Sequence, residues 1–176
     1  MAVDKVTELT LQARTGDPSA IASFVRATQQ EVWQLCTLLG RKGEADDLTQ
    51  ETYMRALRNL PSFRGDASAK TWLLAIARRV CADDFRRAYR TRRLVEKLNL
   101  NAYVDQRPID VSDSGLSAIV AELEPERREA FVLTQIIGLS YEEAAHVCDC
   151  PVGTIRSRVA RARLSLIEEI SDAEAM

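Results

Sequence analysis

The feature that most constrains the fold of this chain is a proline break between two short helical segments, at Asp149-Cys150-Pro151. Ser140 stands at the start of the first segment and Glu143 follows one turn later, a spacing that predicts a capping box. Proline lacks a backbone donor, which costs nothing in the first turn of a helix, so the second segment is expected to begin there. Two helices joined by so short a turn predict a helix-turn-helix.

The second helix has one apolar face and one face of small and basic residues. The apolar stripe consists of Val152, Ile155, Val159, Ala162 and Leu166. The opposite face centres on small residues and is flanked by Arg156 and Arg161. Such a face can enter a DNA groove, where the arginines reach base edges or phosphates. The alternative is an ordinary helical hairpin with a solvated basic face.

The rest of the chain also has helical periodicity, and strand alternation is not evident. Helices are expected over 4–14, 18–39, 44–60 and 70–93, whereas 98–114 is rich in Asn, Asp, Ser and Pro and lacks the pattern. We therefore predict an all-α protein of two small helical domains, residues 1–97 and 115–170, followed by a tail at 171–176. The segment 98–114 is predicted to be a flexible acidic linker.

One face of the expected helix 44–60 is polar and carries Gln50, Glu51, Arg55 and Arg58. A solvated surface is the ordinary interpretation of such a face, and a protein-docking surface is the alternative.

A second basic stretch runs from Lys70 to Arg93, and Trp72, Arg79 and Arg86 recur along one edge of it at heptad spacing. An indole beside guanidiniums suits unstacked bases on a negatively charged backbone. Trp72 is equally compatible with a partly buried core position. Asp84 lies near the buried stripe of this helix, and we expect it to pair with an arginine such as Arg87.

Composition bounds the function classes. The formal net charge of the 176-residue chain is only −2, so a nucleic-acid partner is indicated by the clustering of basic residues and not by the total charge. The scattered cysteines and the lack of an apolar targeting or membrane-spanning run favour a cytoplasmic protein without a disulfide framework. A metal or thiol site at His146, Cys148 and Cys150 is a rival hypothesis, but these residues fall inside the expected turn, so no metal or other cofactor is predicted.

Four motifs together resemble the extracytoplasmic-function group of bacterial RNA polymerase sigma factors, in the sigma-70 family. They are Asp46-Asp47-Leu48-Thr49-Gln50-Glu51-Thr52, Phe63-Arg64-Gly65, Thr71-Trp72-Leu73-Leu74-Ala75-Ile76-Ala77-Arg78, and the stretch from Leu139 to Leu164. The resemblance extends over nearly the whole chain. It implies a non-enzymatic protein that binds core RNA polymerase and directs it to selected promoters, and that an anti-sigma factor could hold inactive.

The resemblance also implies three groups of site residues. Polymerase docking falls on Asp47, Gln50, Glu51 and Arg55. Recognition and melting of the −10 element fall on Phe63, Lys70, Thr71, Trp72, Arg78, Arg79 and Arg86. Recognition of duplex DNA at the −35 element falls on Gly153, Thr154, Arg156, Ser157, Arg158 and Arg161.

One position departs from the family pattern, which often has asparagine where this chain has Arg79. Arginine donates hydrogen bonds but does not reproduce the paired donor and acceptor of an amide, which leaves the preferred −10 base open. The rival function is a conventional dimeric helix-turn-helix regulator that binds duplex DNA alone. The stretch from Trp72 to Arg93 argues against this rival, because a reader of duplex DNA does not need a platform for single strands.

Overall fold

The computed structural model describes residues 4–97 and 115–174, and all regular structure in these two ranges is helical. The elements are α1 (Lys5–Ala13), α2 (Pro18–Leu39), α3 (Ala45–Asn59), the 3₁₀ turn η1 (Leu60–Ser62), α4 (Ala69–Lys97), α5 (Gly115–Glu122), α6 (Pro125–Phe131), the π-helical turn η2 (Val132–Ile136), α7 (Tyr141–Cys148) and α8 (Val152–Glu174). The predicted all-α class is confirmed. The predicted linker 98–114 lies outside the described residues, and α8 continues beyond the expected domain end at residue 170.

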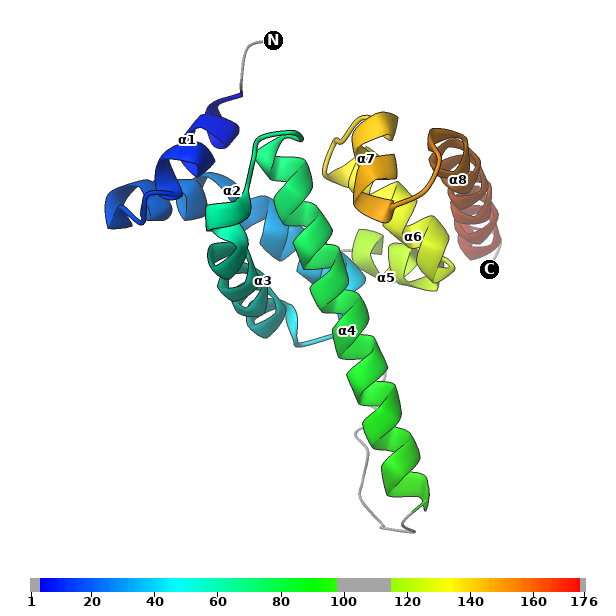
Figure 1. The fold of residues 1–176 in the computed structure, drawn as a ribbon. Coiled ribbons are helices and arrows are strands. Elements are labelled where there is room, and N and C mark those ends of the chain that lie inside the picture. The colour runs from blue at the N-terminus through cyan, green and yellow to red at the C-terminus, as the bar shows by residue number, and fades with distance from the viewer. Residues whose placement is uncertain (1–3, 98–114, 175–176) are drawn as a thin grey trace.

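Helices α1 to α4 form an N-terminal bundle (Figure 1). Asp4 and Asp17 cap α1 and α2 by accepting hydrogen bonds from free backbone N–H groups in the first turn, and Pro18 occupies the first helical position of α2. Phe24 and Leu35 of α2 and Leu73 of α4 are among the largest fully buried side chains of this bundle. The expected helices therefore form, and their apolar stripes meet in one core.

Helix α4 begins inside the bundle and extends well past it (Figure 1). Ser68 caps its start, because the Ser68 Oγ accepts a hydrogen bond from the Thr71 N–H at 3.1 Å. The first turns bury Leu73, Leu74 and Val80, whereas Phe85 and Tyr89 further along are exposed. The long helix thus joins a packed core to a projecting basic arm.

The C-terminal half contains α5 to α8, with α6 and α7 packed against α8. Between α6 and α7 the chain makes a π-helical turn, in which the Ile137 N–H donates to the Val132 carbonyl at 2.9 Å. Gly138 then adopts a φ of +80°, which favours glycine, and the chain reverses into α7. The predicted end of the helix at Gly138 is confirmed.

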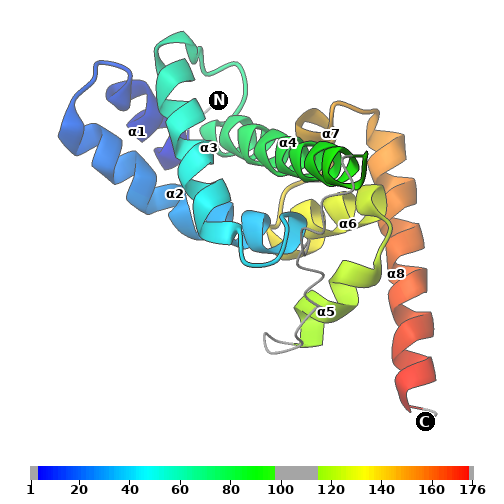
Figure 2. The same ribbon diagram turned by 90° about the horizontal axis from the view of Figure 1, so that it is seen from below.

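The two halves are packed against each other along α4 and α7 (Figures 1 and 2). One cluster of buried apolar residues runs through both, including Leu74 and Ala77 of α4 as well as Leu133 and Ile155 of the C-terminal half. Within the described ranges, no helix is long and apolar enough to cross a membrane.

Candidate docking and nucleic-acid interfaces

The exposed side of α3 carries part of the predicted docking group. Asp47 and Gln50 are exposed, and Met54 and Leu57 continue the same face at helical spacing with 43% and 36% exposure. At the start of the helix, the indole Nε1 of Trp33 on α2 donates to the Asp46 carboxylate at 2.9 Å. The acidic first turn also favours the positive end of the helix dipole. The result is an exposed strip that is acidic at one end and apolar at the other.

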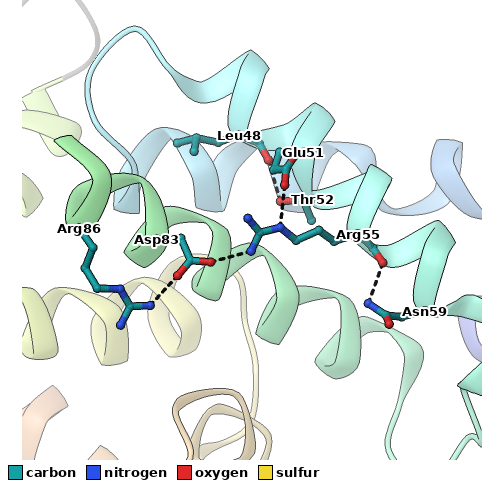
Figure 3. Close-up of polar contacts among 7 residues, drawn as sticks. All are labelled: Leu48, Glu51, Thr52, Arg55, Asn59, Asp83 and Arg86. Carbon is teal, nitrogen blue, oxygen red and sulfur yellow. Dashed lines mark hydrogen bonds and ion pairs between the residues drawn. The ribbon is translucent and has the colours of Figure 1, made fainter. Parts of the chain in front are cut away.

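Glu51 and Arg55 lie beside this strip but are engaged in an ion-pair network (Figure 3). The Arg55 Nε donates to the Glu51 carboxylate at 2.7 Å, and its Nη1 donates to the Asp83 Oδ2 on α4 at 2.6 Å. Asp83 in turn accepts from Arg86 Nη2 through its Oδ1 at 2.6 Å. Hydrogen bonds first from Arg55 and then from Arg86 hold the pKa of Asp83 below its usual value. Two residues predicted for docking are thus linked to one predicted for DNA.

Asp83 was not among the sequence-predicted site residues. Its spacing of three residues from Arg86 on one helix signals a local ion pair. Its contact with Arg55, from a different helix, depends on how α3 packs against α4 and has no local signal.

The prediction that Asp84 pairs with Arg87 is wrong. Asp84 accepts two hydrogen bonds from Arg41, with its Oδ2 2.5 Å from Nε and its Oδ1 3.0 Å from Nη2. Arg41 follows the end of α2, and the packing of α2 on α4 brings it to the buried side of α4. A bidentate guanidinium pair between α4 and the loop after α2 therefore replaces the expected pair within one helix.

The aromatic part of the predicted −10 surface is a packed pair. The rings of Phe63 and Trp72 have centroids 5.0 Å apart and are tilted by 46°. Phe63 is buried and Trp72 is half-buried, as expected for a partly buried core position. Thr71 is 2% exposed and its hydroxyl lies 2.8 Å from that of Ser68, so it contributes to the start of α4 in this conformation.

Two of the predicted DNA-binding cations on α4 instead connect the two halves. The Arg78 Nε donates to the Glu129 carboxylate at 2.9 Å, and these side chains are 26% and 19% exposed. Burial opposes the charge on Arg78, but the Glu129 carboxylate outweighs it and raises the pKa of Arg78. Lys70 donates to Glu31 at 2.7 Å and to the Ile137 carbonyl at 3.4 Å. Arg79 and Arg86, in contrast, are exposed.

A groove of about 680 Å³ lies where α4 faces α7 and the turn after it. Its α4 wall includes Trp72 and Arg79, and its opposite wall includes His146, Asp149 and Pro151. The predicted −10 edge therefore faces the helix-turn-helix of the same chain.

The helix-turn-helix has the predicted caps. Ser140 and Glu143 form the capping box, with hydrogen bonds of 2.9 and 3.1 Å in the two directions. At the turn, Asp149 adopts a left-handed conformation with φ 52°, and the Cys150 N–H donates to the Ala145 carbonyl at 3.1 Å. Helix α8 begins at Val152, directly after Pro151.

Helix α8 presents its two faces as predicted. Ile155, Val159, Ala162 and Leu166 are buried and Val152 is half-buried. Gly153, Arg156, Ser157 and Arg161 are exposed, and Thr154 is half-buried. Arg158 is engaged elsewhere, because it donates to the Glu126 carboxylate at 2.6 Å and contacts the Cys150 Sγ at 3.9 Å. Four of the six predicted −35 residues thus share an open surface.

The rival metal site is not assembled among the described residues, in which no three His, Cys, Asp or Glu side chains are grouped to hold a metal ion. His146 is exposed, whereas Cys148 is buried on the inner side of α7. Burial raises the pKa of the Cys148 thiol to about 12, which disfavours the thiolate that metals bind.

Comparisons with known proteins identify the family of both halves of the chain. A model of sigma-70 region 2 matches residues 24–91, and a model of sigma-70 region 4 matches residues 115–166. The ECF RNA polymerase sigma factor SigC of Mycobacterium tuberculosis is 45% identical over 172 residues, covering 94% of this chain and 91% of that protein. The ECF RNA polymerase sigma factor EcfG of Rhodopseudomonas palustris is 38% identical over 136 residues, covering 74% and 73%.

Solved structures are similar over most of the chain. CnrH, in complex with the cytosolic domain of CnrY, matches with a TM-score of 0.75 and 25% identity and covers 96% of this chain and 99% of that one. The sigma factor RpoE of Bartonella quintana, in complex with the anti-sigma factor NepR, matches with a TM-score of 0.70 and 30% identity, covering 85% and 96%. The chain therefore belongs to the sigma-70 family of RNA polymerase sigma factors, in its extracytoplasmic-function group.

Proposed function

We propose that this sigma factor divides its work among three surfaces, one for core RNA polymerase and two for promoter DNA. As a member of its family it binds core polymerase and directs promoter-specific transcription initiation. Its contribution is binding, with no bond chemistry performed by this chain. Phosphate contacts from the two basic stretches supply affinity, and contacts to base edges supply the choice of promoter.

The polymerase-docking surface is the exposed strip of α3. Asp47 and Gln50 supply polar contacts, and Met54 and Leu57 supply apolar area next to them. An exposed apolar strip bordered by polar side chains is typical of a surface that covers a partner helix. Glu51 and Arg55 support this strip from the side, because their charges are already paired within the chain.

The −10 surface is the edge of α4 that carries Trp72, Arg79 and Arg86. The Phe63 ring packs against the Trp72 indole and supports it. Bases released from the duplex would stack on the indole, and the two exposed arginines would contact the strand backbone. Lys70 and Arg78 join this surface only when their contacts with the C-terminal half are released.

The −35 surface is the outer face of α8, and it is the observation that carries the proposal most directly. Gly153 and Ser157 have small side chains, so the centre of the face does not project. Arg156 and Arg161 are exposed beside them. Because the centre of the face is small, the helix can enter the major groove far enough for the arginines to reach guanine acceptors.

A protein inhibitor is a further proposed partner. The structures of CnrH and RpoE are complexes with CnrY and with the anti-sigma factor NepR, respectively. In this chain the groove between α4 and α7 offers a concave surface, bordered by the proposed −10 edge on one side and by α7 and the turn before α8 on the other.

The experiment that tests the proposed function is run-off transcription with purified core polymerase on a pool of genomic fragments, with and without the chain. Discrete start sites that appear only with the chain, and that share two upstream elements, are the expected result. If the chain instead binds duplex sites unaided and yields no starts, a conventional helix-turn-helix regulator would replace the proposal.

The docking surface has its own test. We expect Asp47→Ala with Gln50→Ala to lower the affinity for core polymerase, because both side chains are exposed on the docking strip, and to leave the helical circular dichroism unchanged. Glu168→Ala, which removes an exposed acid from α8, is the matched control. Equal polymerase affinity in the double variant and the control would remove the docking assignment.

A further inference from the structure

Asp83 receives a guanidinium from each of two proposed interfaces. Arg55 approaches from α3, the docking helix, and Arg86 approaches from the next turn of α4, the promoter-facing helix (Figure 3). Both N–O distances are 2.6 Å. A single carboxylate thus stands between the residues expected to meet polymerase and those expected to meet DNA.

The two pairs use different atoms of the carboxylate. Arg55 occupies Oδ2 and Arg86 occupies Oδ1, so neither arginine displaces the other. Arg55 is fixed from its far side by Glu51, at 2.7 Å. The four side chains therefore form a continuous chain of charge-assisted hydrogen bonds, Glu51–Arg55–Asp83–Arg86.

Arg86 is the last member of this hydrogen-bonded series, and its guanidinium faces solvent. It is 68% exposed, and the contact that the structure gives it uses one of its terminal nitrogens. A guanidinium has five N–H donors in a fixed plane, so the remaining donors stay available for a phosphate or a base edge. A long side chain that is already held in place loses less conformational freedom when it binds.

We propose that Asp83 is a positioning residue, which holds the Arg86 guanidinium ready for promoter DNA and is itself held by Arg55 of the docking helix. This inference rests on the proposed function, in which Arg86 contacts the −10 strand. Through Asp83, a side chain of the docking helix contributes to DNA binding without touching DNA. Promoter binding and polymerase docking are thereby linked through one carboxylate.

The sign of one substitution separates this role from a purely electrostatic one. Removing a carboxylate from a surface that faces DNA should strengthen binding, because it removes repulsion from the phosphates. If Asp83 positions Arg86, Asp83→Asn should instead weaken binding, because the neutral amide holds the guanidinium less firmly.

The experiment measures the binding of assembled holoenzyme, at saturating core polymerase, to a fluorescein-labelled DNA duplex with a pre-opened bubble. Saturation keeps changes in polymerase docking out of the result. The sigma factors compared are the wild type, Asp83→Asn, Arg86→Gln and the double variant. We expect each single variant to bind about three- to tenfold more weakly and the double variant to bind no more weakly than Arg86→Gln alone, as for two side chains that act as a unit.

Asp84→Asn is the matched control. It removes the neighbouring carboxylate, which also joins α4 to another element, but its partner is Arg41 and not a residue of the promoter-facing edge. Both aspartate variants are expected to lower the thermal unfolding midpoint, and only Asp83→Asn is expected to weaken DNA binding. Arg55→Gln provides a second test, because it leaves Asp83 and Arg86 in place and should also weaken DNA binding.

Unchanged or tighter DNA binding by Asp83→Asn would overturn the inference. The inference would also be overturned if Asp83→Asn weakened DNA binding by the same factor in the Arg86→Gln background as in the wild type, because Asp83 would then act independently of Arg86. A wild-type holoenzyme that binds the bubble no better than core polymerase alone is a separate outcome, which overturns the proposed function itself.

Discussion

At the scale of single residues, the exposed arginines of α8 are the simplest to test. Arg156 lies on the open face next to Gly153 and Ser157, and the structure shows it exposed. We expect Arg156→Ala to weaken promoter-dependent transcription by about 1–3 kcal/mol of recognition energy and to relax base choice at the upstream element. Run-off transcription across a randomised promoter library measures both effects.

The control for Arg156 is Arg163→Ala on the same helix. Arg163 lies about two turns further along α8, and its side chain is held by Gln135, to which it donates at 2.6 Å. If Arg156→Ala weakens all sequences equally, the residue is only a phosphate contact.

Tyr53 provides a prediction about pH. Burial raises its pKa to about 12, and its hydroxyl lies 2.7 Å from the Thr28 hydroxyl. In the unfolded chain a tyrosine ionises at about pH 10. Between about pH 10 and 12 the Tyr53 hydroxyl is therefore ionised in the unfolded state and neutral in the folded state. The contribution of Tyr53 to stability is therefore complete below about pH 10 and is lost as the pH rises toward 12.

Urea unfolding at about pH 9 and about pH 11 measures this loss. Tyr53→Phe should show a smaller drop in unfolding free energy between the two conditions than the wild type. At neutral pH the same variant should lose about 0.5–1.5 kcal/mol for the missing hydrogen bond. An equal drop in both proteins would assign the alkaline loss to other groups.

At the scale of secondary-structure elements, local signals in the sequence predicted most of what the structure contains. Caps at Asp17 and Ser140 and the turn at Pro151 are encoded within a few residues, and each one forms. The π-helical turn at Val132–Ile136 had no such signal. It forms by a shift in backbone hydrogen bonding, and the side chains of this segment keep the hydrophobic pattern of an ordinary helix.

The candidate site was predictable to the same degree. The exposed and buried faces of α8 follow from spacing alone, because one helix fixes them. The pairs Arg55–Asp83, Arg41–Asp84 and Arg78–Glu129 join residues that are far apart in the chain. Long flexible side chains choose such partners only after the helices have packed, so periodicity could not identify them.

The capping box of α7 can be tested as an element. Ser140→Ala removes the acceptor for the Glu143 N–H, and we expect a loss of about 0.5–2 kcal/mol in unfolding free energy. Urea denaturation followed by circular dichroism measures it. Glu142→Ala, an exposed acid in the same first turn, is the control and should lose less. Equal losses would mean that charge at the helix start matters and the cap does not.

At the scale of the whole molecule, the packing of α4 against α7 covers part of the proposed −10 surface. Arg78 and Lys70 are held by groups of other helices, and Trp72 faces the helix-turn-helix across the groove. We therefore expect the halves to part before Lys70 and Arg78 can contact DNA. The contact between Arg78 and Glu129 is the ion pair that most directly opposes this step.

Glu129→Lys tests that contact, because it replaces the partner of Arg78 with a like charge. We expect it to weaken the packing of the halves by about 1–3 kcal/mol, since Arg78 is left partly buried without its acceptor. Small-angle X-ray scattering should show a larger radius of gyration. Glu126→Lys breaks a pair with Arg158 inside the C-terminal half and is the matched control. Equal radii in the two variants would show that the pair does not hold the halves together.

The two tryptophans of the chain stand at different proposed interfaces. Trp33 donates to Asp46 at the start of the docking helix, and Trp72 lines the groove between α4 and α7. The emission of an indole depends on its exposure to water, so the protein carries two intrinsic optical reporters. In a Trp33→Phe chain, the remaining fluorescence would follow the separation of the halves in real time, and in a Trp72→Phe chain it would follow docking, without any attached dye.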